Sequence, residues 1–437
     1  MMRRLLSLLL LALLGAGALR AQEETPAKFR LYGFIRNYMV FDSHEVSAGT
    51  QDLYFYMPRD SKLVDGVDVE ARPSFRMLAL TTRLGVDISG YRIGDLQVNG
   101  TVEGDFYSMN GTVATFRLRQ AYMGLLWDNL ELGDLVLNIG QTWHPMAADM
   151  PHVTNLETGA PFNPFNRSPQ VMFHWTVRKF TWTGGILYPM QYLPTGPVGK
   201  SAEYNTYGMI PEVYLGVSFR SGGFLGKAGV DFFSIKPRWA APVITSATIE
   251  GGERILNYDM TRTERNESRL FAISPFVYLQ FTKGMFQFKA KSILAQAGEH
   301  MNLLSGYGAT FDWDRLQLTY TPMQDWASFI SFQYGRKWQL LGMAGYMQRL
   351  GTTKAVFAAD NYMVNALWMN NAAEFNIQRA FRATPTIAYN LGKLTFALEY
   401  NCTGAFFGEG LFGRSGLYET GHWVLNHRIQ QMVKFNF

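Results

Sequence analysis

Long segments in which apolar and polar residues alternate recur along most of the chain. In "MFQFKAKSIL", residues 285–294, the phenylalanines fall on one face and the lysines on the other. The final segment "HRIQQMVKFNF", residues 427–437, alternates in the same way and is broken only at Gln431. Because successive side chains of a strand point to opposite faces, these segments predict β-strands whose two faces meet different surroundings.

Two kinds of protein fit this alternation: a secreted soluble all-β protein and a transmembrane antiparallel β-barrel. The segments are often ten residues or longer, and a tilted membrane strand needs roughly 9–11 residues, whereas strands of soluble proteins average about 5–6. Aromatic residues gather at segment ends, where interfacial girdles would lie, as at Tyr334 and Trp338. Phe437 also ends an amphipathic strand, which resembles the membrane-insertion signature of outer-membrane barrels. We therefore predict a barrel of the outer-membrane type.

The N-terminus has the features of a secretory signal peptide. Two arginines precede an apolar run that starts at Leu5, and small residues follow it. We predict cleavage after Ala21, with Ala18 as the alternative, so that residues 1–21 are the signal peptide and 22–437 the mature chain. The formal net charge of +5 falls to +2 when Arg3, Arg4 and Arg20 are removed. This near-neutral charge gives no reason to expect a nucleic-acid partner.

The length of the mature chain predicts the size of the barrel. At roughly 22 to 27 residues for each strand with its connections, residues 22–437 would form about 16 strands, within a range of 16–18. A barrel of this size encloses an aqueous channel. The single cysteine, Cys402, excludes an internal disulfide.

One segment interrupts the alternation: "GQTWHPMAADMPHVTNLETGAPFNPFNRSP", Gly140–Pro169, which contains five prolines. It is too long for a periplasmic turn, and its prolines stiffen the backbone. We therefore expect a loop that folds into the lumen and narrows the channel. Its constriction residues would be Trp143, Asp149, Glu157 and Arg167. The alternative is a surface loop packed on the barrel rim.

Basic residues recur on the polar faces of the predicted strands, where they would line the channel. On the lipid-facing side each would cost about 2–4 kcal/mol near the bilayer midplane. The predicted channel-lining residues are Arg36, Arg72, Arg76, Arg83, Arg117, Arg119, Lys289, Lys291 and Arg428. They outnumber the acidic residues on the same faces, Asp87, Glu103, Asp105 and Glu399. This excess of basic residues predicts a modest preference for anions. For any single basic residue, the alternative is a structural ion pair across the lumen.

Two short motifs flank the proline-rich loop and resemble the DcaP-like porin family. They are "NIGQTWHPM", Asn138–Met146, and "PFNRSPQVMF", Pro164–Phe173, with matches at Gly140, Gln141, Thr142, Trp143, Arg167, Pro169 and Gln170. The resemblance implies a 16-stranded trimeric outer-membrane porin with basic channels for small anions such as dicarboxylates. One departure is that founding members carry a helical segment before the barrel, whereas here only about six residues precede the first predicted strand. The Ala21–Gln22 junction also resembles those of exported proteins of the Bacteroidetes.

The prediction is thus a passive diffusion channel in the bacterial outer membrane. Its expected partners are membrane lipid and lipopolysaccharide, the barrel-assembly machinery, small anionic solutes and two further copies of the chain. An adhesin or surface-assembly barrel is the alternative, for which a polar extracellular loop over Pro242–Leu270 would supply contacts. A barrel enzyme is less favoured, because no GxSxG or HExxH pattern accompanies the histidines. We expect no catalytic residues, no metal site and no cofactor.

Overall fold

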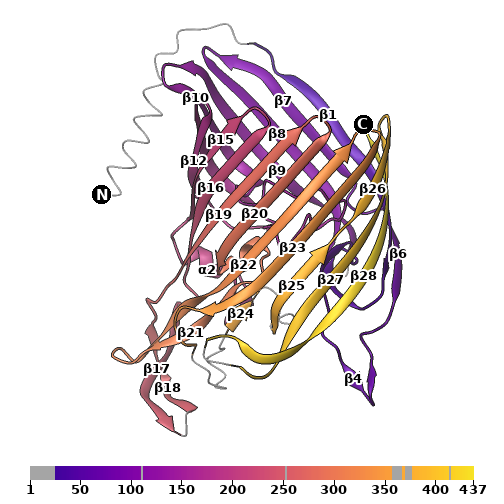
Figure 1. The fold of residues 1–437 in the computed structure, drawn as a ribbon. Helices are drawn as coiled ribbons and strands as arrows, with labels where there is room; N and C mark the ends of the chain where they lie inside the picture. The colour runs from indigo at the N-terminus through magenta and orange to yellow at the C-terminus, as the bar shows by residue number, and fades with distance from the viewer. Residues whose placement is uncertain (1–24, 110–111, 251–252, 357–366, 370–375, 413–414) are drawn as a thin grey trace.

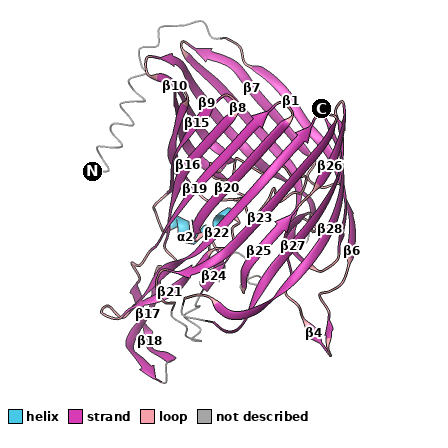
Figure 2. Ribbon diagram, in the orientation of Figure 1, coloured by secondary structure: helices cyan, strands magenta, loops and turns pink. Residues whose placement is uncertain are grey.

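The computed structural model describes residues 25–109, 112–250, 253–356, 367–369, 376–412 and 415–437. Within them the chain forms a closed barrel of tilted strands with very little helix (Figures 1 and 2). No helix in this part of the chain is long and apolar enough to cross a membrane. The predicted signal peptide, residues 1–21, lies outside the described residues.

The barrel has sixteen antiparallel strands, which confirms the predicted fold class at the lower end of its range. Two of these strands are interrupted and carry two labels each. In order around the barrel they are β1 (Lys28–Asp42), β6 and β7 (Ser74–Leu78, Arg83–Ile93), β8 (Leu96–Met109), β9 (Thr112–Leu130), β10 (Gly133–Trp143), β11 (Arg167–Val177), β12 (Phe180–Leu187), β15 (Glu212–Ser221), β16 (Phe224–Ile235), β19 (Leu270–Lys283), β20 (Phe286–Gln296), β22 (Gln317–Gly335), β23 (Trp338–Thr352), β25 and β26 (Ile377–Ala383, Thr386–Leu391), β27 (Leu394–Phe412) and β28 (Tyr418–Asn436).

The first and last strands close the barrel. β1 pairs with β28 from Phe34 opposite Asn436 to Asp42 opposite Arg428. The backbone N–H of Phe437 donates to the carbonyl of Gly33 at 3.1 Å. A Cβ at Gly33 would lie 2.7 Å from the Phe437 ring, so the terminal aromatic side chain packs where only glycine leaves room.

The two ends of the barrel differ in the length of their connections. Short turns, such as those after β11 and β15, lie at one end, and the C-terminus is at this end in Figure 1. The long connections lie at the other end, which by the usual rule for outer-membrane barrels is extracellular. One of them corrects a prediction: the expected loop over Pro242–Leu270 contains a hairpin of β17 (Ala240–Glu250) and β18 (Glu253–Arg265), which forms a sheet separate from the barrel. Its β-branched residues favour strands even though the segment is polar.

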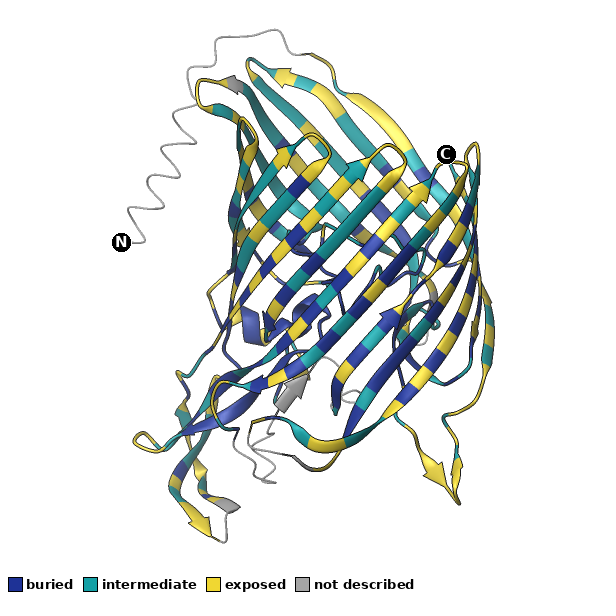
Figure 3. Ribbon diagram, viewed as in Figure 1, coloured by how far each residue is buried: buried dark blue, intermediate teal, exposed yellow. Residues whose placement is uncertain are grey.

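The alternation of the sequence appears directly in the burial of the strands. On β19, alternate residues from Leu270 to Tyr278 are buried, and those between them are exposed on the outer surface (Figure 3). Phe271 is 62% exposed and Val277 54%. Contiguous apolar surface of this extent is rare on soluble proteins and is what a lipid-facing surface requires. The outward face of β19 is therefore apolar from Phe271 to Phe281, whereas its inward face carries both apolar and polar side chains.

Candidate channel constriction

The proline-rich stretch forms a segment that runs through the barrel interior. β10 extends to Trp143 and β11 begins at Arg167, so the connection is residues 144–166, shorter at both ends than the predicted Gly140–Pro169. We call residues 144–166 the internal segment. Its buried residues include Met146, Ala147, Glu157, Ala160, Phe162 and Asn163.

On one side the internal segment is held by lysines of β16 and β20. Lys227 forms an ion pair with Asp149 at 2.8 Å. Lys289 donates to the carbonyl of Met150 at 2.8 Å. Lys291 donates to the carbonyl of Met146 at 2.8 Å and to the Asn163 side chain. These lysines therefore bind the segment itself.

On the other side it reaches the strands near the closure of the barrel. The backbone N–H of Thr154 donates to Glu399 of β27 at 2.7 Å, and Tyr38 of β1 donates to the carbonyl of Thr154 at 2.9 Å. Arg382 of β25 forms a buried ion pair with Glu157 at 3.2 Å. Because the segment starts at β10 and contacts β16, β20, β25, β27 and β1, it crosses the interior from wall to wall.

A stacked pair marks the point where the internal segment leaves the wall. Trp143 and Arg167 are opposite each other in the pairing of β10 with β11. The Arg167 guanidinium lies 4.5 Å from the centre of the Trp143 ring and 5.4 Å from that of Phe165. Gln170 donates to the carbonyl of Trp143 at 3.1 Å. The two motifs that flank the loop in the sequence are therefore cross-strand neighbours.

Arg167 is 2% exposed, yet it forms no ion pair with any described carboxylate. Its Nη1 has no hydrogen-bond partner in the described chain. Aromatic faces replace the missing carboxylate, since their negative π surfaces attract the cation. The rings therefore orient the guanidinium without a direct contact to an acid.

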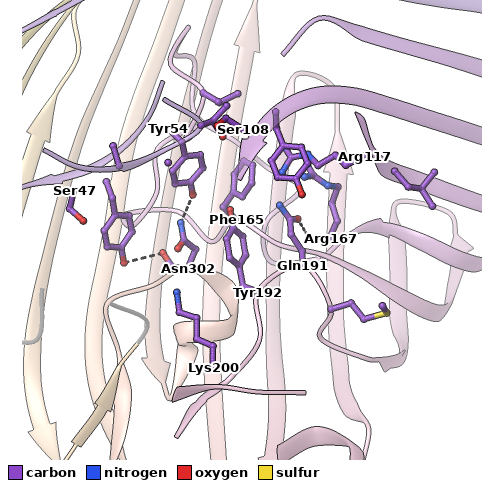
Figure 4. Close-up of a pocket in the computed structure, with 18 of the residues that line it drawn as sticks. Ser47, Tyr54, Ser108, Arg117, Phe165, Arg167, Gln191, Tyr192, Lys200 and Asn302 are labelled. Carbon is purple, nitrogen blue, oxygen red and sulfur yellow. Dashed lines mark hydrogen bonds between the residues drawn. The ribbon is translucent and has the colours of Figure 1, made fainter. Parts of the chain in front are cut away.

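Two cavities lie in this part of the barrel. The first, of about 560 Å³, includes Arg167 and lies beside the tyrosines and Gln191 seen in Figure 4. The second, of about 690 Å³, includes Trp143 and extends to the short turns after β11 and β15. The basic residues that line them are Arg117, Arg167 and Lys200 in the first and Arg178, Lys179, Arg220 and Lys227 in the second. No aspartate or glutamate is among the described residues lining either cavity.

Of these seven basic residues, the sequence analysis predicted Arg117 and Arg167 as site residues, and it did not predict the other five. Arg178 and Lys179 lie in a turn, and Arg220 lies near a strand end, so none of them stands out in an alternating pattern. Lys227 does alternate on β16. Its contact with Asp149 depends on the path of the internal segment, which the sequence does not specify.

Most of the nine predicted channel-lining residues pair with acids. Arg117 pairs with Asp105 at 2.8 Å, and Arg119 lies between Asp105 and Glu103 at 2.6 and 2.9 Å. The other ion pairs are Arg83 with Glu103, Arg76 with Asp52, and Arg428 with Asp42. Arg36 instead donates to the Thr81 hydroxyl. Of the nine predicted channel-lining residues, only Arg117 lines one of the two cavities.

Arg72 departs furthest from its predicted place. It lies in no strand, because the short hairpin of β4 (Leu63–Val64) and β5 (Val67–Asp68) and a connection precede β6. Its side chain is largely exposed and pairs with Glu45 at 3.0 Å. The proline that follows Arg72 lacks an N–H and delays the start of the strand.

Structural comparison finds the same fold in solved outer-membrane proteins. The outer-membrane channel DcaP of Acinetobacter baumannii matches with a TM-score of 0.64 at 16% identity, over 94% of this chain and 97% of that one. OmpT of Vibrio cholerae matches with a TM-score of 0.53 at 12% identity, over 94% and 98%. No family model and no curated protein sequence matches the chain. The predicted resemblance to DcaP is thus confirmed at the level of the fold.

Proposed function

We propose that this chain is an outer-membrane porin through which small hydrophilic solutes diffuse passively, with a modest preference for anions. The observation that carries the proposal is the lining of the two cavities: seven basic residues and no described acidic one. The fold, shared with outer-membrane channels, supports the same function.

Selection in such a channel depends on diameter and on the charge along the path. The internal segment reduces the free cross-section between the cavities, and Trp143 and Arg167 stand at its base. A solute anion would pass between basic groups that attract it weakly at several points, so that it can both enter and leave. Lys227 contributes less than its charge suggests, because Asp149 neutralises part of it.

The chemistry of the solute follows from the resemblance rather than from the cavities. The DcaP-like motifs imply small dicarboxylates and a trimeric assembly, and both belong to the proposal. The lipid-facing aromatic and aliphatic surface suits insertion in a membrane containing lipopolysaccharide. Phe437 at the closing strand suits recognition by the barrel-assembly machinery.

Reversal potentials in planar bilayers test the proposal. The purified, folded protein is placed between two concentrations of potassium chloride, and the sign of the zero-current potential shows which ion is more permeant. We expect an anion-selective potential and conductance steps in groups of three. A cation-selective potential, or no conductance from a heat-modifiable folded barrel, would contradict it.

A further inference from the structure

Four ionisable side chains meet on the inner side of the barrel wall, next to Trp143, Pro145 and Tyr214 of the second cavity but not among its lining residues. His144 follows β10, Glu212 begins β15, Asp231 lies on β16, and His300 lies on the short helix η1 (Gly298–Met301). All four are at most 2% exposed. Asp231 is opposite Tyr214 in the strand pairing, two residues from Glu212, so both carboxylates point to the inner face.

The atoms of three of these side chains, those of His144, Glu212 and Asp231, are spaced as ligands of one small cation. The fourth, His300, contacts Glu212. His144 Nε2 lies 3.1 Å from Glu212 Oε1 and 3.6 Å from Asp231 Oδ1, and His300 Nε2 lies 2.9 Å from Glu212 Oε1. One ligand atom from each of His144, Glu212 and Asp231 lies within 4.8 Å of the others. Zinc bonds of about 2.0–2.2 Å at tetrahedral angles place neighbouring ligand atoms about 3.3–3.6 Å apart. The observed separations fall around that range.

The carboxylates leave oxygens without partners in the described chain. Both oxygens of Asp231 and Oε2 of Glu212 are buried and accept no hydrogen bond from any described residue. Burying an ionised carboxylate is costly unless it is paired or binds a metal. Two adjacent carboxylates with three such oxygens therefore point to a missing positive charge.

His300 is held in a fixed orientation beside Glu212. Its Nδ1 lies 3.2 Å from the carbonyl of Ala297, so the proton is on Nδ1. Its ring stacks on Phe233 with the centroids 3.9 Å apart. In a neutral ring, Nε2 then carries a lone pair that faces the Glu212 carboxylate. Two lone pairs repel each other, so this contact requires either a second proton on His300 or a cation between the two groups. A histidine whose far nitrogen donates to a backbone carbonyl is typical of metal sites.

We propose that His144, Glu212 and Asp231 bind one divalent transition-metal cation, with zinc as the best match, and that His300 positions Glu212 in this site. An imidazole and two carboxylates are ligands that suit zinc. The two carboxylate charges balance the cation, so the complex is neutral in a site without water contact. This inference concerns the stability of the barrel wall and does not depend on the solute that crosses it.

Metal binding at His144 also changes a contact of the internal segment. In the structure His144 Nδ1 accepts a hydrogen bond from the N–H of Met146 at 3.1 Å, so its proton lies on Nε2. A cation on Nε2 moves that proton to Nδ1, and the contact with Met146 is lost. The site therefore couples the cation to the first residues of the segment that crosses the channel.

Metal content of the folded protein tests the site. A tag-free protein, folded in detergent, is stripped with a chelator, incubated with zinc, desalted and measured by mass spectrometry of the metal. We expect about one zinc per chain, and at least a ~10-fold lower content for Asp231→Asn and for His300→Gln. His427→Gln is the matched control, since His427 contacts Tyr400 elsewhere in the barrel, and it should retain the zinc of the native chain.

Cobalt gives a second readout that needs no variant. Cobalt(II) in the stripped native protein should show the strong visible absorption of a four-coordinate ion, and zinc should displace it. Less than about 0.1 zinc per native chain would overturn the proposal. Equal zinc in the native chain and both variants, each verified as folded by its heat-modifiable migration, would overturn it as well. None of these measurements involves conductance, so failure of the metal-site proposal can be distinguished from failure of the channel proposal.

Discussion

At the scale of single residues, the cation of Arg167 is the most unusual feature of the interior. Three other buried arginines of the barrel wall, Arg119, Arg382 and Arg428, are held by carboxylates. Arg167 is held by two aromatic rings, which orient the guanidinium without cancelling its charge. Its field therefore acts on the cavity that it lines.

Replacing Arg167 with glutamine should weaken anion selectivity. We expect the anion-to-cation permeability ratio to fall by about two-fold, since six other basic residues share the field. Reversal potentials measure the change. Arg315→Gln is the control, because Arg315 is exposed and lies outside both cavities, and an equal fall in this variant would contradict the role of Arg167.

Glu157 should make the position of the internal segment depend on pH. Burial raises the pKa of Glu157 from 4.5 to about 7, although the nearby Arg382 and Arg428 oppose the shift. The docked segment therefore binds a proton more tightly than the undocked one, and docking weakens as the pH rises from 4.5 towards 7. Current noise from undocking should increase between about pH 5 and about pH 8, and Glu157→Gln should abolish most of the increase. Unchanged pH dependence in the variant would assign the effect to another group.

At the residue scale the sequence identified acids and bases but not their partners. Asp149 and Glu157 were predicted as constriction residues, and the structure pairs them with Lys227 and Arg382. The partners are 78 and 225 positions away in the chain. Alternation shows which face a side chain occupies; it contains no information on which distant residue shares that face.

At the scale of elements, the internal segment is the part that we propose narrows the channel. Replacing residues 148–160 with a short glycine linker should raise single-channel conductance several-fold, on the order of the gain in free cross-section. Removing the β17–β18 hairpin is the matched control, because it forms a sheet apart from the barrel and its loss should leave conductance unchanged. If both deletions give the native conductance, the segment does not limit the current.

The strands themselves could be predicted because alternation is a local property. The segment 285–294 became β20, Phe286–Gln296, and the final alternating segment became part of β28. The interruptions between β6 and β7 and between β25 and β26 were not predicted. They arise where β1 and β23 each pair in turn with two separate partner segments, which is a property of neighbours and not of the local sequence.

At the scale of the whole molecule, the outer surface and the closing strands decide how the barrel assembles. Phe437→Ala should reduce the yield of heat-modifiable folded protein by roughly half or more, because the ring packs on Gly33 where β28 meets β1. Phe271→Ala, at a lipid-facing position that is 62% exposed, should fold like the native chain. Equal yields of both variants would show that the terminal ring is dispensable.

Barrel size could be predicted to within two strands, because length and strand spacing constrain it. The buried group of His144, Glu212, Asp231 and His300 could not, since its members are spread over more than 150 positions and share no spacing motif. Only the closed sheet brings the end of β10 and the start of β15 next to η1. A site of this kind depends on the topology of the fold and cannot be predicted from local sequence patterns.

The pairing of β1 with β28 joins residues about 400 positions apart. The barrel can therefore close only when its last strand is present. Every other strand can find a neighbour close to it in the chain, whereas β1 exposes an unpaired edge until the last strand arrives. A chain cut short before β28 would therefore keep two open edges, whatever the quality of the strands between them. Such an edge is a template for pairing with other chains, so incomplete copies would aggregate where the complete chain closes on itself.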